Sequence, residues 1–416
     1  MDNVKYNEAN KKLKKYRQEH LFKFMNDLSS DQADVLIEQV LSIDFDLVKE
    51  LYINAADNAN LNSEINTEPL ECTEIEKLSA GEISKLNEIG NKAIKDGKVC
   101  AVTVAGGQGT RLGHNGPKGT FDIGLPSGRS MFNILCDRLK ILSDKNDSKI
   151  PWYIMTSEEN NADTIRFFEE NNYFGYCSQD IVFFKQCMMP VVDAITGKIL
   201  LKEKDSIAMG ADGHGGVFKA MVSSNVLKDM AERGCEYVFL CGIDNVLVRM
   251  ADPLFIGFAS LENTDCASKG VLKRDPYEKA GIFCLNNGKP AVIEYTELSD
   301  EIRFSKNENG DYKYGDINLL SYVFKFEVLN KIAEFGLPYH TALKKCNHIN
   351  EEGMSVAPET ENAYKFETFL FDAFGQLKNM SVLRGTREKE FAPVKNKTGA
   401  DSPETAVKLL LSAGEN

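Results

Sequence analysis

The chain has 416 residues, of which 43% are hydrophobic, and a formal net charge of −13 at pH 7. This length allows a large core and more than one domain. The negative charge argues against nonspecific binding to nucleic acid or to an anionic membrane. The first residues are charged and lack an apolar h-region, and no apolar stretch reaches membrane-spanning length. Neither a signal peptide nor a transmembrane helix is therefore expected.

The ten cysteines indicate the redox environment. Several stand inside apolar runs: Cys100, Cys241, Cys266 and Cys284. None belongs to a Cys-x-x-Cys pattern, and no histidine pair has the spacing of a zinc site. This usage predicts buried, reduced thiols and a cytoplasmic protein.

Residues 1–97 are expected to form an N-terminal helical segment without evident chemistry. Two capping-box patterns precede apolar helical periodicity: Ser29-x-x-Gln32 and Ser79-x-x-Glu82. The second helix should end at Gly97. Between the two helices, 55–69 is rich in Asn, Asp and Ser and is expected to be a loop.

Residues 98–380 alternate between apolar strand patterns and helical patterns, which predicts an α/β domain with a mostly parallel sheet covered on both faces. The strand candidates are Val99–Ala105, Trp152–Met155, Ile181–Phe184, Tyr237–Cys241, Gly281–Leu285 and Ala291–Tyr295. The helix candidates include Met131–Leu142, Ala162–Glu170 and Ser223–Arg233. Residues 381–416 should form a short C-terminal segment with a helix from Pro403 to Ala413, capped by Ser402.

The glycine-rich stretch VTVAGGQGTRLGHNGPKG, residues 102–119, follows the strand at Val99–Ala105. Glycines in such a loop let peptide N–H groups approach phosphate oxygens, and Arg111 and Lys118 can neutralise phosphate charge. A P-loop is excluded because Gly-Lys-Ser/Thr is missing, and a dinucleotide fingerprint fails at Leu112. The alternative is an ordinary turn after a core strand, which the second basic residue, set in Pro-Lys-Gly, disfavours.

Asp244 follows the strand at Tyr237–Cys241. Ligands of open α/β sheets bind outside the carboxyl ends of the strands, where both this carboxylate and the glycine loop are expected. A carboxylate facing phosphates would repel them unless it held a cation, which predicts a Mg²⁺ ligand, with Mn²⁺ as a possible substitute. The alternative for Asp244 is an Asx turn with Asn245.

AGGQGTRLG followed by PKG resembles the signature loop of the UDP-sugar pyrophosphorylases. Further blocks are similar to the eukaryotic-type UDP-N-acetylglucosamine pyrophosphorylases and occur in that family's order: FDIGLPS, PWYIMTS, NYFG, FFKQCMMP, ADGHGG, DNVLV, ADPLFIGF, IEYTE and EFAPVKN. The matching blocks run from about residue 99 to 410. Members of this branch usually continue into a further β-rich domain, which is not expected within 381–416.

The resemblance implies a Rossmann-like nucleotidyltransferase fold and transfer of uridylate from UTP to a sugar 1-phosphate. Arg111 and Lys118 would be catalytic, and no protein nucleophile is needed because the sugar phosphate is already ionised. The nucleotide would be bound by Val104, Ala105, Gly106, Gly107, Gln186, Gly213, Asp244 and Lys365. The sugar and its phosphate would be bound by His214, Gly281, Glu294, Tyr295, Asp316 and Lys395. The expected partners are these substrates alone, in a monomer or weak homo-oligomer.

Two positions depart from the acetylglucosamine branch, which generally carries Asn where this chain has His214 and Asp316. Gly-His-Gly occurs in the UDP-glucose and broad UDP-sugar branches. The other blocks favour N-acetylglucosamine 1-phosphate, with glucose or galactose 1-phosphate as the alternative. Two other classes are disfavoured. A non-catalytic UDP-sugar-binding protein should have lost Arg111, Lys118 or Asp244, and a glycosyltransferase should carry Asp-x-Asp at the strand end.

Overall fold

The computed structural model describes residues 2–57 and 67–414, which divide into two compact units. Unit 1 comprises 1–64, 187–216 and 337–370, and unit 2 comprises 65–186, 217–336 and 371–416. The units therefore cut across the consecutive segments 1–97, 98–380 and 381–416 expected from the sequence. Periodicity along the chain indicates elements, but it does not show which distant segments share a core.

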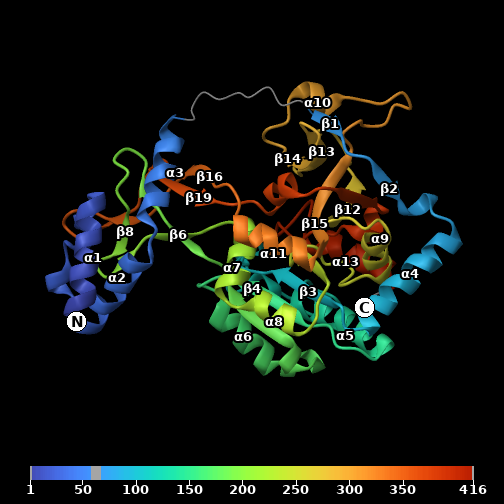
Figure 1. Cartoon of the computed structure of the whole chain (residues 1–416), viewed down its shortest axis with the longest axis horizontal. Helices are drawn as coiled ribbons and strands as arrows, with labels where there is room; N and C mark the ends of the chain where they lie inside the picture. Colours follow the sequence, from blue (N-terminus) through green and yellow to red (C-terminus); the bar gives the residue numbers. More distant parts are fainter. Residues whose placement is uncertain (1, 58–66, 415–416) are drawn as a thin grey trace. The chain divides into compact units, whose positions relative to one another are not determined.

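Unit 2 contains a sheet of eleven strands (Figure 1). Its strands are β1 (Thr67–Pro69), β2 (Cys72–Glu74), β3 (Val99–Val104), β4 (Trp152–Thr156), β5 (Ile181–Lys185), β11 (Tyr237–Gly242), β12 (Cys266–Leu272), β13 (Ile282–Asn286), β14 (Lys289–Ile293), β15 (Asp316–Lys325) and β20 (Met380–Arg384). Its helices are α4 (Ala80–Lys95), α5 (Met131–Asn146), α6 (Asn161–Glu170), α7 (Val217–Ser223), α8 (Val226–Glu232), α9 (Pro253–Leu261), α10 (Asp300–Phe304), α11 (Phe326–Phe335), α12 (Arg387–Glu390) and α13 (Pro403–Ser412).

The main path of the sheet runs β2-β20-β12-β15-β11-β3-β4-β5. Neighbours pair in parallel except at β15, which is antiparallel to both β12 and β11. The expected α/β class with a mostly parallel sheet is confirmed. Two strand candidates, now β13 and β14, form an antiparallel hairpin joined by the turn at 287–288, so they do not extend the parallel order.

Every residue of β4 is buried, which shows that both faces of the sheet are covered there. Helices provide this cover. On one face, Trp152 of β4 packs edge-on against Phe132 of α5 and Phe168 of α6. On the other face, Phe218 of α7 packs edge-on against Phe324 of β15. Aromatic pairs of this kind contribute about 0.5–1.5 kcal/mol each beyond the area that they bury.

Unit 1 is built from three helices and short strands: α1 (Asn3–Tyr16), α2 (Ser30–Ser42), α3 (Phe45–Asp57), β6 (Met188–Pro190), β7 (Val192–Asp193), β8 (Leu201–Glu203), β9 (Ser206–Ile207), β10 (Met209–Ala211), β16 (His340–Lys344), β17 (His348–Ile349), β18 (Ser355–Val356) and β19 (Ala363–Glu367). Its core joins Leu13, Ile37 and Val48 of the helices with Val192 and Phe366 of the strands. The N-terminal helices thus share a core with two later segments of the chain.

The local signals for helix ends are confirmed. Ser29 and Ser79 each cap a helix in a complete capping box, and Ser402 caps α13 in the same way. α4 ends at Lys95, and Gly97 follows with a φ of +70°. Of the loop expected at 55–69, α3 occupies the start and β1 the end, while 58–66 lies outside the described residues.

The cysteines and the helices also bear on the expected class of protein. None of the ten cysteines, all of which the structure describes, forms a disulfide. Burial raises the pKa of the Cys241 thiol to about 12. Within 2–57 and 67–414, no helix combines the length and the apolar character needed to cross a membrane.

Candidate active site

The glycine-rich loop and Asp244 meet because β3 and β11 are parallel neighbours. Val104 at the end of β3 pairs with Gly242 at the end of β11, and the backbone N–H of Ile243 donates to Val104 O at 3.1 Å. Both strands therefore release their chains at the same edge of the sheet, as expected for parallel strands. The loop at 105–118 and the turn at 243–246 leave from this edge.

The glycine-rich loop is closed by its own backbone. Lys118 N donates to Gly107 O at 3.0 Å, and Gly109 N donates to Gly116 O at 2.9 Å. The buried Asn160 braces the loop from α6's N-terminal side, because its Nδ2 donates to Ala105 O at 3.0 Å and to Gly107 O at 3.3 Å. The loop thus presents its basic side chains from a fixed backbone.

Lys118 and Asp244 form the central contact of the site. The Lys118 Nζ donates to Asp244 Oδ1 at 2.5 Å. The lysine side chain is only 11% exposed, whereas the aspartate side chain is 43% exposed. The ammonium is therefore held in place by a carboxylate that itself stays open to an incoming ligand.

A cavity of about 760 Å³ opens over this contact within unit 2. The residues expected from the sequence that line it are Gly107, Arg111, Lys118, Asp244, Tyr295 and Lys395. The lining residues that sequence reasoning missed are Gln108, Thr110, Leu112, Lys279, Asn396 and Asp401. Four cations and two carboxylates thus surround one space, although the whole chain is acidic. Such a surplus of positive charge suits a ligand with several phosphates.

The residues present fit a Mg²⁺ that arrives with phosphates better than one held by protein alone. Among the described residues, no group of three or more His, Cys, Asp or Glu side chains could hold a metal ion. Asp244 offers one exposed carboxylate inside the cavity. Mg²⁺ is usually bound by one or two carboxylates together with substrate phosphates and waters, and Asp244 could supply such a ligand.

Gln186, expected at the nucleotide, lies against the glycine loop in unit 2. Its backbone N–H donates to Thr156 O at 2.8 Å, next to the end of β5. A Cβ built on Gly106 would lie 2.5 Å from Gln186 Oε1. A side chain at residue 106 would therefore displace this amide from its observed position.

Gly213, His214 and Lys365 belong to unit 1. Gly213 has a φ of +83°, and a Cβ there would lie 2.4 Å from Thr368 O. The His214 Nδ1 accepts a hydrogen bond from Leu370 N at 3.1 Å, which leaves the ring proton on Nε2 in the neutral form. Lys365 is on β19, next to Gly210.

Gly281, Glu294 and Tyr295 form one group at the β13–β14 hairpin. Tyr295 lines the cavity. A Cβ on Gly281 would lie 3.0 Å from Glu294 Oε1, so the two residues are neighbours. Burial raises the pKa of the Glu294 carboxyl, Glu297 raises it further, and Lys395 opposes the shift.

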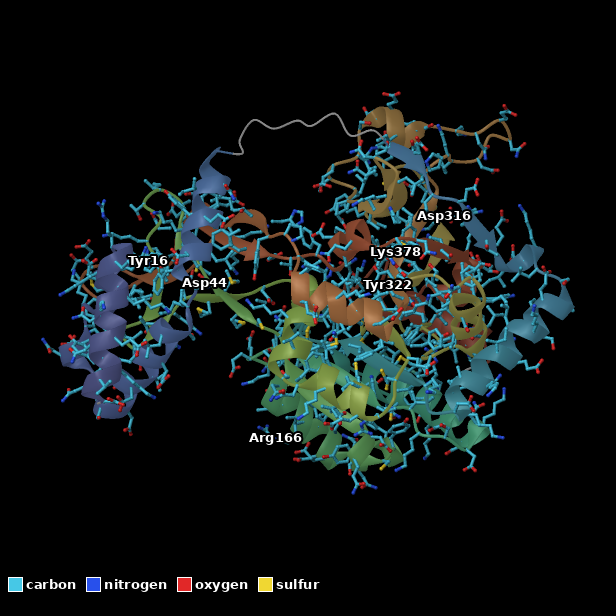
Figure 2. The ribbon with its side chains drawn as sticks, in the orientation of Figure 1. Tyr16, Asp44, Arg166, Asp316, Tyr322 and Lys378 are labelled. Carbon is cyan, nitrogen blue, oxygen red and sulfur yellow. The ribbon has the colours of Figure 1, made fainter. Side chains whose placement is uncertain are left out.

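Asp316, expected at the sugar and labelled in Figure 2, is at the start of β15. Its side chain is buried and paired with an arginine. Arg384 Nε donates to one carboxylate oxygen and Nη2 to the other, both at 2.6 Å. This bidentate pair connects β15 to β20, and Asp316 is not among the cavity-lining residues. Its partner stands 68 residues away in the sequence.

A glycine-rich loop and a carboxylate at adjoining ends of parallel strands, surrounded by cations, define an α/β protein that binds phosphorylated ligands. The model of the UTP–glucose-1-phosphate uridylyltransferase family matches residues 50–412, and the chain belongs to this family. The resemblance inferred from the motifs is thereby confirmed.

Individual relatives show which members of this family the chain is similar to. The chain is 38% identical to the UDP-N-acetylglucosamine pyrophosphorylase of Saccharomyces cerevisiae, over 86% of this chain and 78% of the yeast protein. It is 34% identical to a probable UDP-N-acetylglucosamine pyrophosphorylase of Dictyostelium discoideum, over 98% of this chain and 88% of that protein. The solved uridine diphosphate N-acetylglucosamine pyrophosphorylase of Trypanosoma brucei matches with a TM-score of 0.85 and 29% identity, covering 99% of this chain and 85% of that one.

The raised pKa of Glu294 leads to a prediction about stability. Because the folded carboxyl has the higher pKa, stability is lost as the pH rises through the interval between the unfolded and folded values, and the loss persists above it. Glu294→Gln should therefore raise the melting temperature of the ligand-free protein at neutral pH. The gain should vanish below the ordinary glutamate value of about 4.3. Thermal unfolding of the wild type and the variant, from below about pH 4.3 to neutral pH, measures the difference in melting temperature. An equal difference at the acidic and the neutral end would contradict the prediction.

Proposed function

We propose that the protein joins UTP and N-acetylglucosamine 1-phosphate to give UDP-N-acetylglucosamine and pyrophosphate. The observation that carries this proposal is the single cavity in which Arg111, Lys118, Asp244 and Lys395 meet, at the ends of β3 and β11. Membership of the uridylyltransferase family and the named relatives support it. The enzyme would be a UTP:sugar-1-phosphate uridylyltransferase.

The reaction requires positioning and charge neutralisation rather than a protein nucleophile. An oxygen of the sugar phosphate forms a bond to the α-phosphorus of UTP, and the bond from that phosphorus to the α–β bridging oxygen breaks. Pyrophosphate leaves with the electron pair. Two anions must approach each other, so the barrier is largely electrostatic.

Arg111 and Lys118 have different tasks in this proposal. Lys118 is buried and held by Asp244, so its ammonium is fixed near the strand ends, where the α-phosphate would lie. Arg111 is on the exposed tip of the loop and can accompany the charge that develops on the leaving pyrophosphate. Asp244 would hold a Mg²⁺ that accompanies the triphosphate and neutralises part of its charge.

The two departures from the family pattern, His214 and Asp316, bear on which sugar is bound. The structure shows that these two side chains have different contacts. Asp316 uses both carboxylate oxygens on Arg384, so its charge is compensated within the fold. His214 has one ring nitrogen fixed by the backbone of Leu370. We therefore attribute any change in sugar preference to His214. The alternative, a UDP-glucose or broad UDP-sugar pyrophosphorylase, stays open to the assay below.

We further propose a cytoplasmic location and a monomer or weak homo-oligomer. The six buried free cysteines support the location, since buried free thiols are typical of a reducing compartment. Gel filtration over a range of protein concentrations would measure the assembly.

The substrate is tested with UTP, Mg²⁺ and a panel of sugar 1-phosphates, scored by pyrophosphate release. We expect N-acetylglucosamine 1-phosphate to give the highest kcat/KM and glucose 1-phosphate to be detectable. His214→Asn should shift the preference further toward the acetylated sugar, whereas Asp316→Asn, the control, should lower the melting temperature without changing the preference. Turnover of glucose or galactose 1-phosphate alone would move the protein to the alternative, and no turnover of any sugar would refute the reaction.

The metal role of Asp244 predicts that Asp244→Asn abolishes turnover at saturating Mg²⁺ while the protein stays folded. The cause is loss of the cavity's exposed carboxylate at the strand ends. Asp401→Asn is the matched control, because this carboxylate also lines the cavity, and it should keep the Mg²⁺ dependence of the wild type. Activity of the wild type in excess chelator, or full activity of Asp244→Asn, would disprove the assignment.

Arg111→Ala should lower kcat by about 10²–10³-fold, the effect of removing one donor that stabilises developing charge. The KM for UTP should change much less, because the contact strengthens as charge moves to the leaving group. Steady-state kinetics with UTP varied separate the two parameters, and Arg111→Lys tests whether charge alone suffices. A change confined to KM would show that Arg111 only helps binding.

A further inference from the structure

One cation of the cavity belongs to none of the motifs that carry the family resemblance. Lys279 lies in the loop between β12 and β13 and lines the same cavity as Arg111 and Lys118. Its side chain is exposed, and among the described residues it forms no ion pair, whereas Lys118 is paired with Asp244. Its positive charge therefore faces the cavity without a carboxylate to neutralise it.

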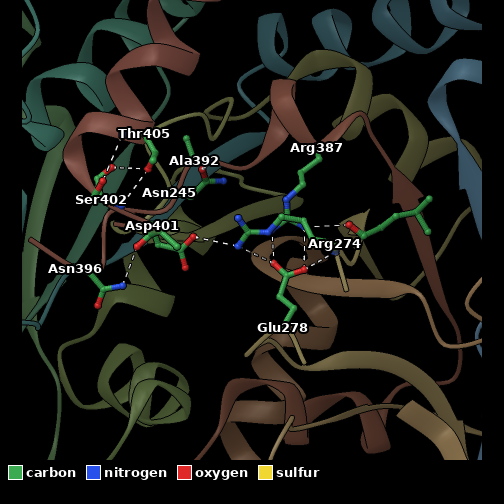
Figure 3. Close-up of polar contacts among 11 residues, drawn as sticks. Asn245, Arg274, Glu278, Arg387, Ala392, Asn396, Asp401, Ser402 and Thr405 are labelled. Atoms are coloured by element: carbon green, nitrogen blue, oxygen red, sulfur yellow. Dashed lines mark hydrogen bonds and ion pairs between the residues drawn. The ribbon is translucent and has the colours of Figure 1, made fainter. Parts of the chain in front are cut away.

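The residue before Lys279 fixes the loop (Figure 3). The Glu278 carboxylate accepts hydrogen bonds from Arg387, through both Nη1 at 3.2 Å and Nη2. Arg274 adds an ion pair at 3.5 Å from its Nη2 and a backbone N–H donation at 2.7 Å. The Glu278 side chain is only 8% exposed, so this is a largely buried carboxylate between two guanidinium groups. If one guanidinium moved away, the charge of the Glu278 carboxylate would lose part of its compensation, which is energetically costly. This cost keeps Glu278 and its two arginine partners in place.

A second contact connects this loop to the C-terminal segment that carries Lys395. The Arg274 Nη2 lies 3.6 Å from Asp401 Oδ1. The backbone oxygen of Asp401 accepts from Lys395 N at 2.7 Å and from Asn396 N at 3.0 Å. Glu278, Arg274 and Asp401 form one network of contacts, which Figure 3 draws. Through this network the backbones that carry the two cavity-lining lysines are connected.

An exposed lysine on a surface loop ordinarily needs no fixed backbone, because its charge is solvated in any position. Here an ionic cluster around a largely buried carboxylate stands directly beside the lysine, and the lysine faces a space already rich in cations. Grouping like charges is unfavourable for an empty site and becomes favourable when a polyanion binds.

We propose that Lys279 binds a phosphate group in the catalytic cavity and that Glu278 is the residue that positions it. This inference rests on the proposed function, and the chemistry that Lys279 recognises is a phosphate dianion or pyrophosphate. The phosphate belongs either to the sugar 1-phosphate or to the leaving pyrophosphate.

Kinetics in both directions distinguish the two sources. Lys279→Met should raise the KM of one ligand by about tenfold, the effect of losing one charge-assisted contact, with a smaller change in kcat. If the sugar phosphate is bound, the forward KM for the sugar 1-phosphate rises. If pyrophosphate is bound, its KM in the reverse reaction rises together with that of UTP. Lys279→Arg should keep most of the affinity.

Lys289→Met is the matched control, because Lys289 is an exposed lysine of the neighbouring hairpin that does not line the cavity. All KM values should stay at the wild-type level in this variant. Equal KM values in Lys279→Met and Lys289→Met, for every substrate, would overturn the inference.

The positioning role of Glu278 is tested by a double-mutant cycle. Glu278→Gln should raise the KM of the same ligand as Lys279→Met, and the double variant should be no worse than Lys279→Met alone, because Glu278 acts through the lysine. Additive effects on KM, or an effect of Glu278→Gln on the melting temperature alone, would show that Glu278 has only a structural role.

A binding experiment distinguishes failure of the proposed function from failure of the inference about Lys279. If the wild type turns over no sugar 1-phosphate, binding of pyrophosphate and of N-acetylglucosamine 1-phosphate is measured instead by calorimetry, with wild type, Lys279→Met and Lys289→Met. Weaker binding of either probe to Lys279→Met alone supports the inference even then. Equal binding of both probes to all three proteins refutes it.

Discussion

The relation between the two sides of the cavity depends on the side-chain amide of Asn245. Its Nδ2 donates to Glu390 O at 2.7 Å, and its Oδ1 accepts from Ala392 N at 2.9 Å. Val394 N also donates to Asp244 O at 2.9 Å. The strand-end turn and the C-terminal segment are thus hydrogen-bonded directly beside two side chains that line the cavity, Asp244 and Lys395. The Asx turn considered as the alternative for Asp244 is made by Asn245 instead, whose Oδ1 accepts from Leu247 N at 3.2 Å.

Behind this contact, buried charges hold the C-terminal segment in position. Lys269 of β12 is 3% exposed and lies 3.0 Å from Glu390 Oε1 and 3.3 Å from Asp252 Oδ2. Desolvating three charges is costly, and such clusters often contribute little net stability. Their geometry, however, tolerates little displacement, because separating one partner leaves a buried charge unpaired. The acidic chain thus has internal ion pairs in the support of the site. Of the cations that line the cavity, Lys118 is paired with Asp244, whereas no ion pair of the described residues involves Arg111, Lys279 or Lys395.

Features that depend on residues close together in the chain could be predicted from the sequence, whereas features that depend on distant residues could not. Capping boxes such as Ser29 with Gln32, and strands such as 99–104, depend on neighbours within a few residues, so they were predictable. β15 was missed, and its central antiparallel place depends on pairing with strands far away in the chain. The meeting of the glycine loop with Asp244 was predictable, because parallel strands end at one edge. Lys279 gave no signal, since an exposed loop lysine has no pattern and its place depends on Arg387, more than a hundred residues away.

The same reasoning applies to the departures from the family pattern. A substitution changes specificity only through what its side chain contacts in the folded protein. At position 316 a carboxylate meets a bidentate guanidinium, so the additional negative charge is neutralised inside the sheet, between β15 and β20. At position 214 an imidazole has its Nδ1 committed to a backbone N–H, which sets the neutral ring's proton on Nε2 and makes that nitrogen a donor. One departure is thereby compensated by a partner within the fold, whereas the other changes the hydrogen-bonding character of the side chain itself. Two differences of equal weight in a sequence comparison therefore have unequal consequences for the folded protein.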